Sequence, residues 1–129
     1  MNGAGTDIYG TNDQFHYAYQ PVNGNGTLIA RVTSQTNTSA NAKAGIMFKQ
    51  STTAGAPYIL IAAAPGGGIK VQYNFNASVG GGTYPFPNAW MKLTRVGNVF
   101  TAYVSADGIT SARQFSCPFC GLHLLLCAQ

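Results

Sequence analysis

The sequence predicts an all-β protein, and three observations lead to that prediction. Sixteen Gly and six Pro punctuate a chain of 129 residues. The runs between them are rich in Thr, Val, Ile, Tyr and Phe, which favour a pleated, half-buried surface. No window sustains the 3.6-residue periodicity of a helix. Short strands at regular spacing with glycine-rich turns indicate one domain, built as a sandwich or a barrel.

The strands are placed by their polarity patterns and by the turns between them. The run KVQYNFN places Lys, Gln and Asn on one face and Val, Tyr and Phe on the other, and the apolar patch YILIAAAP fits a strand. Residues 89–108 are the clearest case. Two alternating runs flank Gly97-Asn98, which suits a two-residue hairpin turn, and Asp107-Gly108 marks a second turn. The predicted strands are 14–19, 27–34, 44–50, 58–63, 70–76, 90–96 and 99–105, and the predicted loops are 21–26, 36–41, 52–55, 65–68 and 80–88.

Charged residues are few: three Asp, no Glu, four Lys and three Arg give a net charge of +4. The seven cations are spread over separate strands, whereas a nucleic-acid site gathers its cations on one face or stripe. We therefore expect no nucleic-acid partner. No run is long enough to span a membrane, so we expect no membrane insertion. Low charge with many Asn, Thr, Ser and Gln is typical of secreted β proteins, so we expect an extracellular location, with no signal peptide in this sequence.

The composition changes near residue 111, which divides the chain into a module, residues 1–110, and an atypical tail, residues 111–129. All three cysteines lie in the tail. The CPFC motif has the spacing of metal and redox sites, and Cys127 and His123 would complete a Cys3His set for zinc. The βαβ pattern that surrounds a redox CxxC is missing from the sequence. The favoured interpretation is an unusual C-terminus with incidental thiols, of which at least one is unpaired within a chain.

Three stretches of residues 3–110 follow a family pattern. They are GTDIYGTNDQFHYAYQPVNGNGTLIARVTSQTNT, AKAGIMFKQS and AWMKLTRVGNVFTAYVSADG, in that order. Together they resemble bacterial extracellular modules of the concanavalin A-like lectin/glucanase superfamily. The resemblance implies an antiparallel jelly-roll β-sandwich and a carbohydrate-binding role. The family continues with D-G-x-x-W and further closing strands, whereas Ser111 stands at the Trp position, so we expect the closing strands to be missing or replaced.

Candidate ligand residues are aromatic rings, which cover the apolar faces of sugars, and polar groups beside them. Three of the aromatic residues stand at strands or loop edges. Three polar residues share one face of the strand at 70–76, whose other face is apolar. The competing interpretation is that the aromatics are core residues, as most are in a small sandwich. The six candidates for binding a polysaccharide or glycan are Tyr58, Lys70, Gln72, Asn74, Tyr84 and Trp90.

Catalysis is not expected. Glycoside hydrolysis uses two carboxylates across the scissile bond, and the only acids in the sequence are Asp7, Asp13 and Asp107. A turn accounts for Asp107. Asp7 and Asp13 are candidates for a calcium site, because calcium takes carboxylate and carbonyl oxygens, and backbone capping is the competing interpretation. Apart from calcium at that site, we expect no cofactor.

The sequence thus predicts a non-catalytic extracellular carbohydrate-binding module. The main alternative is a structural or adhesive β-sandwich that assembles with itself, and a glycan-active enzyme domain comes third. A sandwich without its closing strands leaves an edge that recruits another strand. Residues 115–127 of the tail could fill that edge, and LHLLL suits a short strand, but we expect pairing with a second copy. The predicted protein is therefore a homo-oligomer joined through its C-terminal edge.

Overall fold

A computed structural model describes residues 7–9, 12–73, 77–117 and 123–125, and in these residues the chain forms strands and no helix. The strands are β1 (Asp7–Tyr9), β2 (Asn12–Gln14), β3 (Gly26–Val32), β4 (Ala44–Lys49), β5 (Tyr58–Ala63), β6 (Gly68–Tyr73), β7 (Ala77–Thr83), β8 (Ala89–Val96), β9 (Val99–Ser105), β10 (Ala112–Cys117) and β11 (His123–Leu125). Nothing in these ranges is a helix long and apolar enough to cross a membrane.

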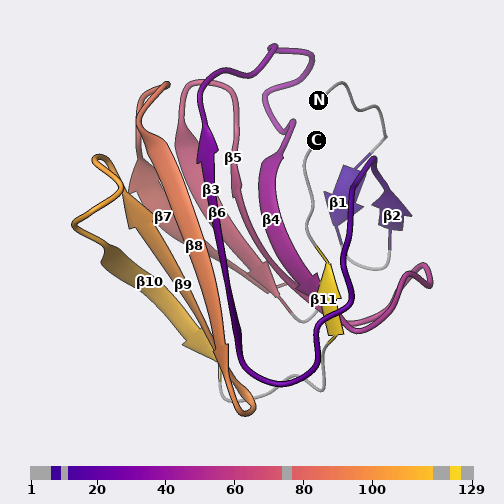
Figure 1. Cartoon of the computed structure of the whole chain (residues 1–129). Coiled ribbons are helices and arrows are strands. Elements are labelled where there is room, and N and C mark those ends of the chain that lie inside the picture. The colour runs from indigo at the N-terminus through magenta and orange to yellow at the C-terminus, as the bar shows by residue number, and fades with distance from the viewer. Residues whose placement is uncertain (1–6, 10–11, 74–76, 118–122, 126–129) are drawn as a thin grey trace.

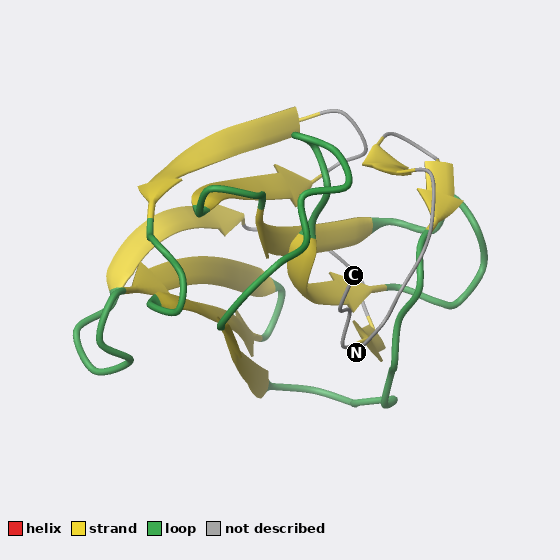
Figure 2. Ribbon diagram, turned by 90° about the horizontal axis from the view of Figure 1, so that it is seen from above, coloured by secondary structure: helices red, strands yellow, loops and turns green. Residues whose placement is uncertain are grey.

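Two antiparallel sheets face each other, as Figure 1 shows, so the chain has the predicted all-β, sandwich-like architecture. The four-stranded sheet has the order β10-β9-β8-β3, and the five-stranded sheet has the order β11-β4-β5-β6-β7. A separate hairpin pairs β1 with β2. The view from above shows only strands and loops in the described chain (Figure 2).

The main core lies between the two sheets and follows the alternation in the sequence. In β8, Ala89, Met91 and Leu93 are buried while the residues between them are half-buried. Phe48 of β4 meets Phe100 of β9 edge to face, with 5.4 Å between ring centroids, which joins the two sheets. Because side chains alternate along a strand, the residues between these core positions point to the outer faces of the sandwich.

The five-stranded sheet is covered on its outer face as well. Ile8 of the β1–β2 hairpin packs there with Met47, Leu60 and Ala62, which alternate with core residues along β4 and β5. Every residue of β4 and β5 is consequently buried. This explains why AGIMFKQ and YILIAA read as apolar runs rather than as alternating strands.

The predicted strand at 14–19 is wrong. β2 ends at Gln14, and residues 15–20 carry no strand pairing. Phe15 and Tyr17 pack against the outer cluster of the five-stranded sheet, whereas His16 between them is exposed. The alternation is therefore present, but it comes from an extended segment that lies on a sheet instead of within one.

The predicted loop at 80–88 is wrong over its first residues, because β7 runs through the glycines and pairs with β6. Gly81 shows why this strand contains glycine. A Cβ at Gly81 would lie 2.8 Å from Cγ2 of Ile69, closer than real contacts allow. The missing side chain lets the edge strand pack tightly on its neighbour.

The tail contributes strands to both sheets. β10 extends the four-stranded sheet beside β9, and β11 pairs with β4. Phe115 of β10 stacks on Tyr73 of β6, with 4.0 Å between ring centroids, so β10 also contacts the opposite sheet. The short strand predicted near the end of the chain is present as β11, whereas Cys120 and Cys127 lie outside the described residues.

Candidate functional site

A cavity of about 220 Å³ opens on the outer face of the five-stranded sheet, and we call it the outer pocket. Strands β5, β6 and β7, with the residue that follows β5, supply most of its wall, and the segment before β4 supplies the rest. The lining residues are Asn41, Lys43, Ala62, Ala64, Lys70, Gln72 and Ser78.

The hollow follows from a row of small residues across three strands. Lys70 pairs with Ala62 of β5 on one side and with Gly80 of β7 on the other. Paired residues of an antiparallel sheet point to the same face, so Lys70 projects between two neighbours that have almost no side chain. In the next row Gln72 pairs with Leu60 and with Ser78, which closes one side of the hollow.

The outer pocket is basic. Two of its described lining residues are lysines, and none of those described is acidic. Lys43 is 8% exposed, and its Nζ donates a hydrogen bond of 3.0 Å to the main-chain oxygen of Ile8. This bond joins a lining residue of the pocket to the β1–β2 hairpin. Lys70 is exposed, and it makes no hydrogen bond or ion pair within the described part of the chain.

Gln72 presents a buried acceptor with no donor. Its side chain is 4% exposed, and its Oε1 accepts no hydrogen bond from the described residues. Leaving such an oxygen unsatisfied costs about 1–3 kcal/mol. Gln72 lines the outer pocket, so a ligand hydroxyl that reached this oxygen would supply the missing donor.

The structure brings together two of the six predicted ligand residues, Lys70 and Gln72, in the outer pocket. Asn74, which the sequence placed on the same face, lies outside the described residues. Tyr58 is 1% exposed, with the Nζ of Lys49 5.8 Å from its ring centroid, so it is a buried ring rather than an exposed platform.

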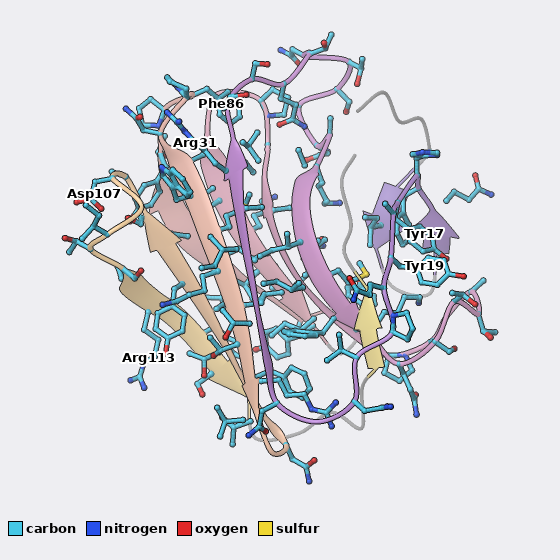
Figure 3. The ribbon with its side chains drawn as sticks, in the orientation of Figure 1. Tyr17, Tyr19, Arg31, Phe86, Asp107 and Arg113 are labelled. Atoms are coloured by element: carbon cyan, nitrogen blue, oxygen red, sulfur yellow. The ribbon has the colours of Figure 1, made fainter. Side chains whose placement is uncertain are left out.

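Tyr84 and Trp90 lie away from the outer pocket. Tyr84 packs against the core between the sheets. Trp90 lies half-buried on the outer face of the four-stranded sheet, where it lines a smaller cavity of about 110 Å³. The guanidinium carbon of Arg31 is 5.3 Å from the centroid of its ring, and Gly108 packs against that ring. Arg31 and the Asp107 turn lie toward the same end of the sandwich in Figure 3.

Asp107 is the acid whose side chain the structure describes, and it organises the loop after β9. Its Oδ1 accepts hydrogen bonds of 2.8 Å from the main-chain nitrogens of Ile109 and Thr110 and from the Ser105 hydroxyl. The bonds from Ile109, Thr110 and Ser105, in that order, lower the pKa of Asp107 to about 2. The predicted turn role of Asp107 is thus confirmed.

The calcium site remains a prediction. In the hairpin, Asp7 pairs with Gln14 and Asp13 with Ile8, so the two acids stand one register step apart on neighbouring strands. Their side chains lie outside the described set. Within the described set, no group of three or more His, Cys, Asp or Glu could hold a metal ion.

The sequence did not predict three polar residues that line the outer pocket: Asn41, Lys43 and Ser78. Ser78 was missed because the glycine run hid β7. A second missed feature is the ladder of Phe15, Tyr17 and Tyr19, whose successive ring centroids are 4.9 Å and 5.6 Å apart. Its signal was the period-two aromatics of FHYAY. Figure 3 shows Tyr17 and Tyr19 near the β1–β2 hairpin.

Comparisons with protein-family models, curated proteins and solved structures gave no match to this chain.

Proposed function

We propose that this chain is a non-catalytic carbohydrate-binding module of an extracellular protein, with a concanavalin A-like jelly-roll fold. The observation that carries the proposal is the outer pocket, in which a buried, donorless oxygen of Gln72 lies beside Lys70 and Ser78. A sugar ring offers hydroxyl donors and acceptors at close spacing, which matches such a set of polar groups. A volume of about 220 Å³ suits one ring of a chain better than a longer segment.

The jelly-roll part of the proposal is supported by the strand order. β3 pairs with β8, more than fifty residues further along the chain, while β4 to β7 form the other sheet between them. Such a crossover between two sheets is a feature of jelly rolls. Hydrolysis is not part of the proposal, because the sequence holds no Glu and none of the described residues that line the outer pocket is acidic.

Binding to a glycan array, followed by calorimetry on the polysaccharides that give a signal, tests the proposal. We expect dissociation constants of roughly micromolar to millimolar, because a shallow pocket buries little area. Gln72→Leu removes the oxygen that a sugar hydroxyl would satisfy, so it should abolish the signal.

A matched control is available in Gln35→Leu. Gln35 also has a buried Oε1 without a hydrogen bond, but it does not line the outer pocket. This variant should bind like the parent protein. Silence across neutral and acidic polysaccharides, or equal binding by the parent and Gln72→Leu, would contradict the proposal.

A second candidate function is self-assembly, which the four-stranded sheet favours. Four exposed large hydrophobic side chains lie on its outer face or in its turns: Ile29, Val96, Val99 and Ile109. Apolar groups gathered on one face are typical of protein contacts. A sedimentation mass that rises with concentration and falls back to the monomer value in Ile29→Thr, together with silence on the array, would favour assembly.

A further inference from the structure

We infer that the outer pocket selects an acidic sugar, a ring that carries an anionic group together with free hydroxyls. This inference rests on the proposed function. In it, the Lys70 ammonium pairs with the anionic group while Oε1 of Gln72 accepts a hydrogen bond from a hydroxyl.

The charge of the pocket carries the first half of the inference. Lys70 projects from the middle of the row Ala62–Lys70–Gly80, and neither neighbour has a side chain that reaches it. Lys43 also lines the cavity, with its ammonium bonded to the main-chain oxygen of Ile8, and none of the described lining residues is acidic. A bound anion would therefore meet the Lys70 ammonium within a small hollow, where partial exclusion of water strengthens the attraction.

The hydrogen-bonding groups carry the second half. An anion alone leaves Oε1 of Gln72 unsatisfied, because a carboxylate or sulfate oxygen accepts hydrogen bonds and does not donate them. A neutral sugar satisfies Gln72 but gives the Lys70 ammonium no counter-charge. A ring that supplies both an anion and a hydroxyl is the ligand that matches both groups at once. Uronic acids and sulfated sugars share this chemistry.

Lys70 thus acts as the residue that distinguishes acidic from neutral sugars, while Gln72 recognises the ring in either case. Replacing Lys70 should therefore remove the preference for acidic over neutral sugars without abolishing binding. This separation makes the inference testable apart from the proposed function itself.

The experiment measures binding to sodium polygalacturonate, to the same polymer after methyl esterification, to neutral galactan and to sulfated galactan. The parent protein should bind polygalacturonate about tenfold more tightly than its methyl ester, the gain that a hydrogen bond to a charged group provides. Lys70→Gln should lose this preference and keep its affinity for the neutral polymers. The sulfated galactan arm shows whether the anion must be a carboxylate.

Lys92→Gln is the matched control. Lys92 lies on the outer face of the four-stranded sheet, above Tyr103, and its loss changes the net charge by the same amount. If the two variants lose affinity for polygalacturonate equally, the effect is one of net charge and the inference is wrong. Equal binding of acidic and neutral polymers by the parent overturns the inference but leaves the proposed function standing. No binding to any polymer contradicts both.

Discussion

Gln72 has a position that stability alone does not explain. A buried side-chain oxygen without a donor destabilises the folded state, and an apolar residue of similar size would avoid the cost. Residues of this kind are found where binding requires a group that folding does not. Under the proposed function, this side chain lowers the stability of the folded protein and contributes to ligand binding.

We expect Gln72→Leu to leave the free energy of unfolding unchanged or to raise it by up to about 1 kcal/mol, because the unsatisfied oxygen is removed. Urea denaturation of the ligand-free protein measures the change. Gln35→Leu should behave in the same way, since its oxygen is buried and unsatisfied as well. A fall of more than about 1 kcal/mol in Gln72→Leu would show that the amide makes stabilising contacts in the folded protein.

Asp107 predicts a dependence of stability on pH. Its folded pKa of about 2 is below its ordinary value of 3.8, so the folded state favours the ionised carboxyl. The stabilisation is complete above about pH 4 and is lost as the pH falls through the interval down to about 2. Melting temperatures measured from pH 5 to pH 2 should fall across this window. The fall should be smaller in Asp107→Asn, and an identical fall in that variant would contradict the assignment.

Among the structural elements, the loop after β9 depends on a single glycine. Gly108 has a φ of 77°, and a Cβ there would lie 2.9 Å from Cε2 of Trp90. Gly97, in the turn between β8 and β9, has a φ of 59°, and nothing lies within 4 Å of the place its Cβ would take. Both glycines adopt a positive φ, which disfavours other residues, but only at Gly108 does a neighbouring side chain also occupy the place of a Cβ.

Gly97→Ala should therefore lower the free energy of unfolding by about 1 kcal/mol, the cost of the left-handed conformation alone. Gly108→Ala should lower it by about 2 kcal/mol or more, because Trp90 must also move. Thermal melts and the fluorescence of Trp90, the single tryptophan, measure both effects. An unchanged emission spectrum in Gly108→Ala would show that the loop does not pack on the indole.

The strands that the sequence predicts correctly are those whose signals lie in residues adjacent in the chain. The β8–β9 hairpin carries alternation and a turn dipeptide, and both are properties of neighbouring residues. β7 was missed because its glycines resemble a loop in the sequence. The reason for one of them, Gly81, is its close contact with Ile69 on the neighbouring strand, which the local sequence does not show. Residues 15–20 were misassigned because packing on a sheet produces the same period-two pattern as pairing within it.

The candidate site was found in part for the same reason. Lys70 and Gln72 share a face of one strand, which alternation reveals. Lys43 and Ser78 reach the pocket from elements that are distant in sequence, so only the fold brings them there. The sequence places Tyr58 and Trp90 near strand ends but does not show whether another part of the chain covers them. Tyr58 is buried and Trp90 is half-buried in the fold.

The whole molecule has two unlike outer faces. The five-stranded sheet carries the basic, polar outer pocket and the β1–β2 hairpin. The four-stranded sheet carries exposed aliphatic side chains beside Lys92 and Arg113, and Figure 3 shows Arg113 pointing away from the sandwich. The two proposed functions, sugar binding and self-assembly, therefore use opposite faces of one sandwich.

Removing residues 111–129 tests what the tail contributes to the whole molecule. The deletion leaves β9 and β4 as uncovered edges and takes Phe115 away from Tyr73. We expect aggregation or unfolding, because unpaired edges recruit other strands. Truncation after Leu125, which keeps β10 and β11, is the control. Light scattering and thermal melts measure the outcome, and a deletion that stays monomeric and equally heat-stable would show that the two strands contribute nothing.

The burial of β4 and β5 on both faces has a consequence for how the molecule opens. β5 lies between β4 and β6, β4 pairs with β5 along its length and with β11 over Met47–Lys49, and every residue of both strands is buried. Solvent reaches their backbone amides only when both the β1–β2 hairpin and the opposite sheet have moved away. The slowest amide hydrogen exchange should therefore map to these two strands, so their exchange rates would report global unfolding, while faster exchange elsewhere would reveal which layer separates first.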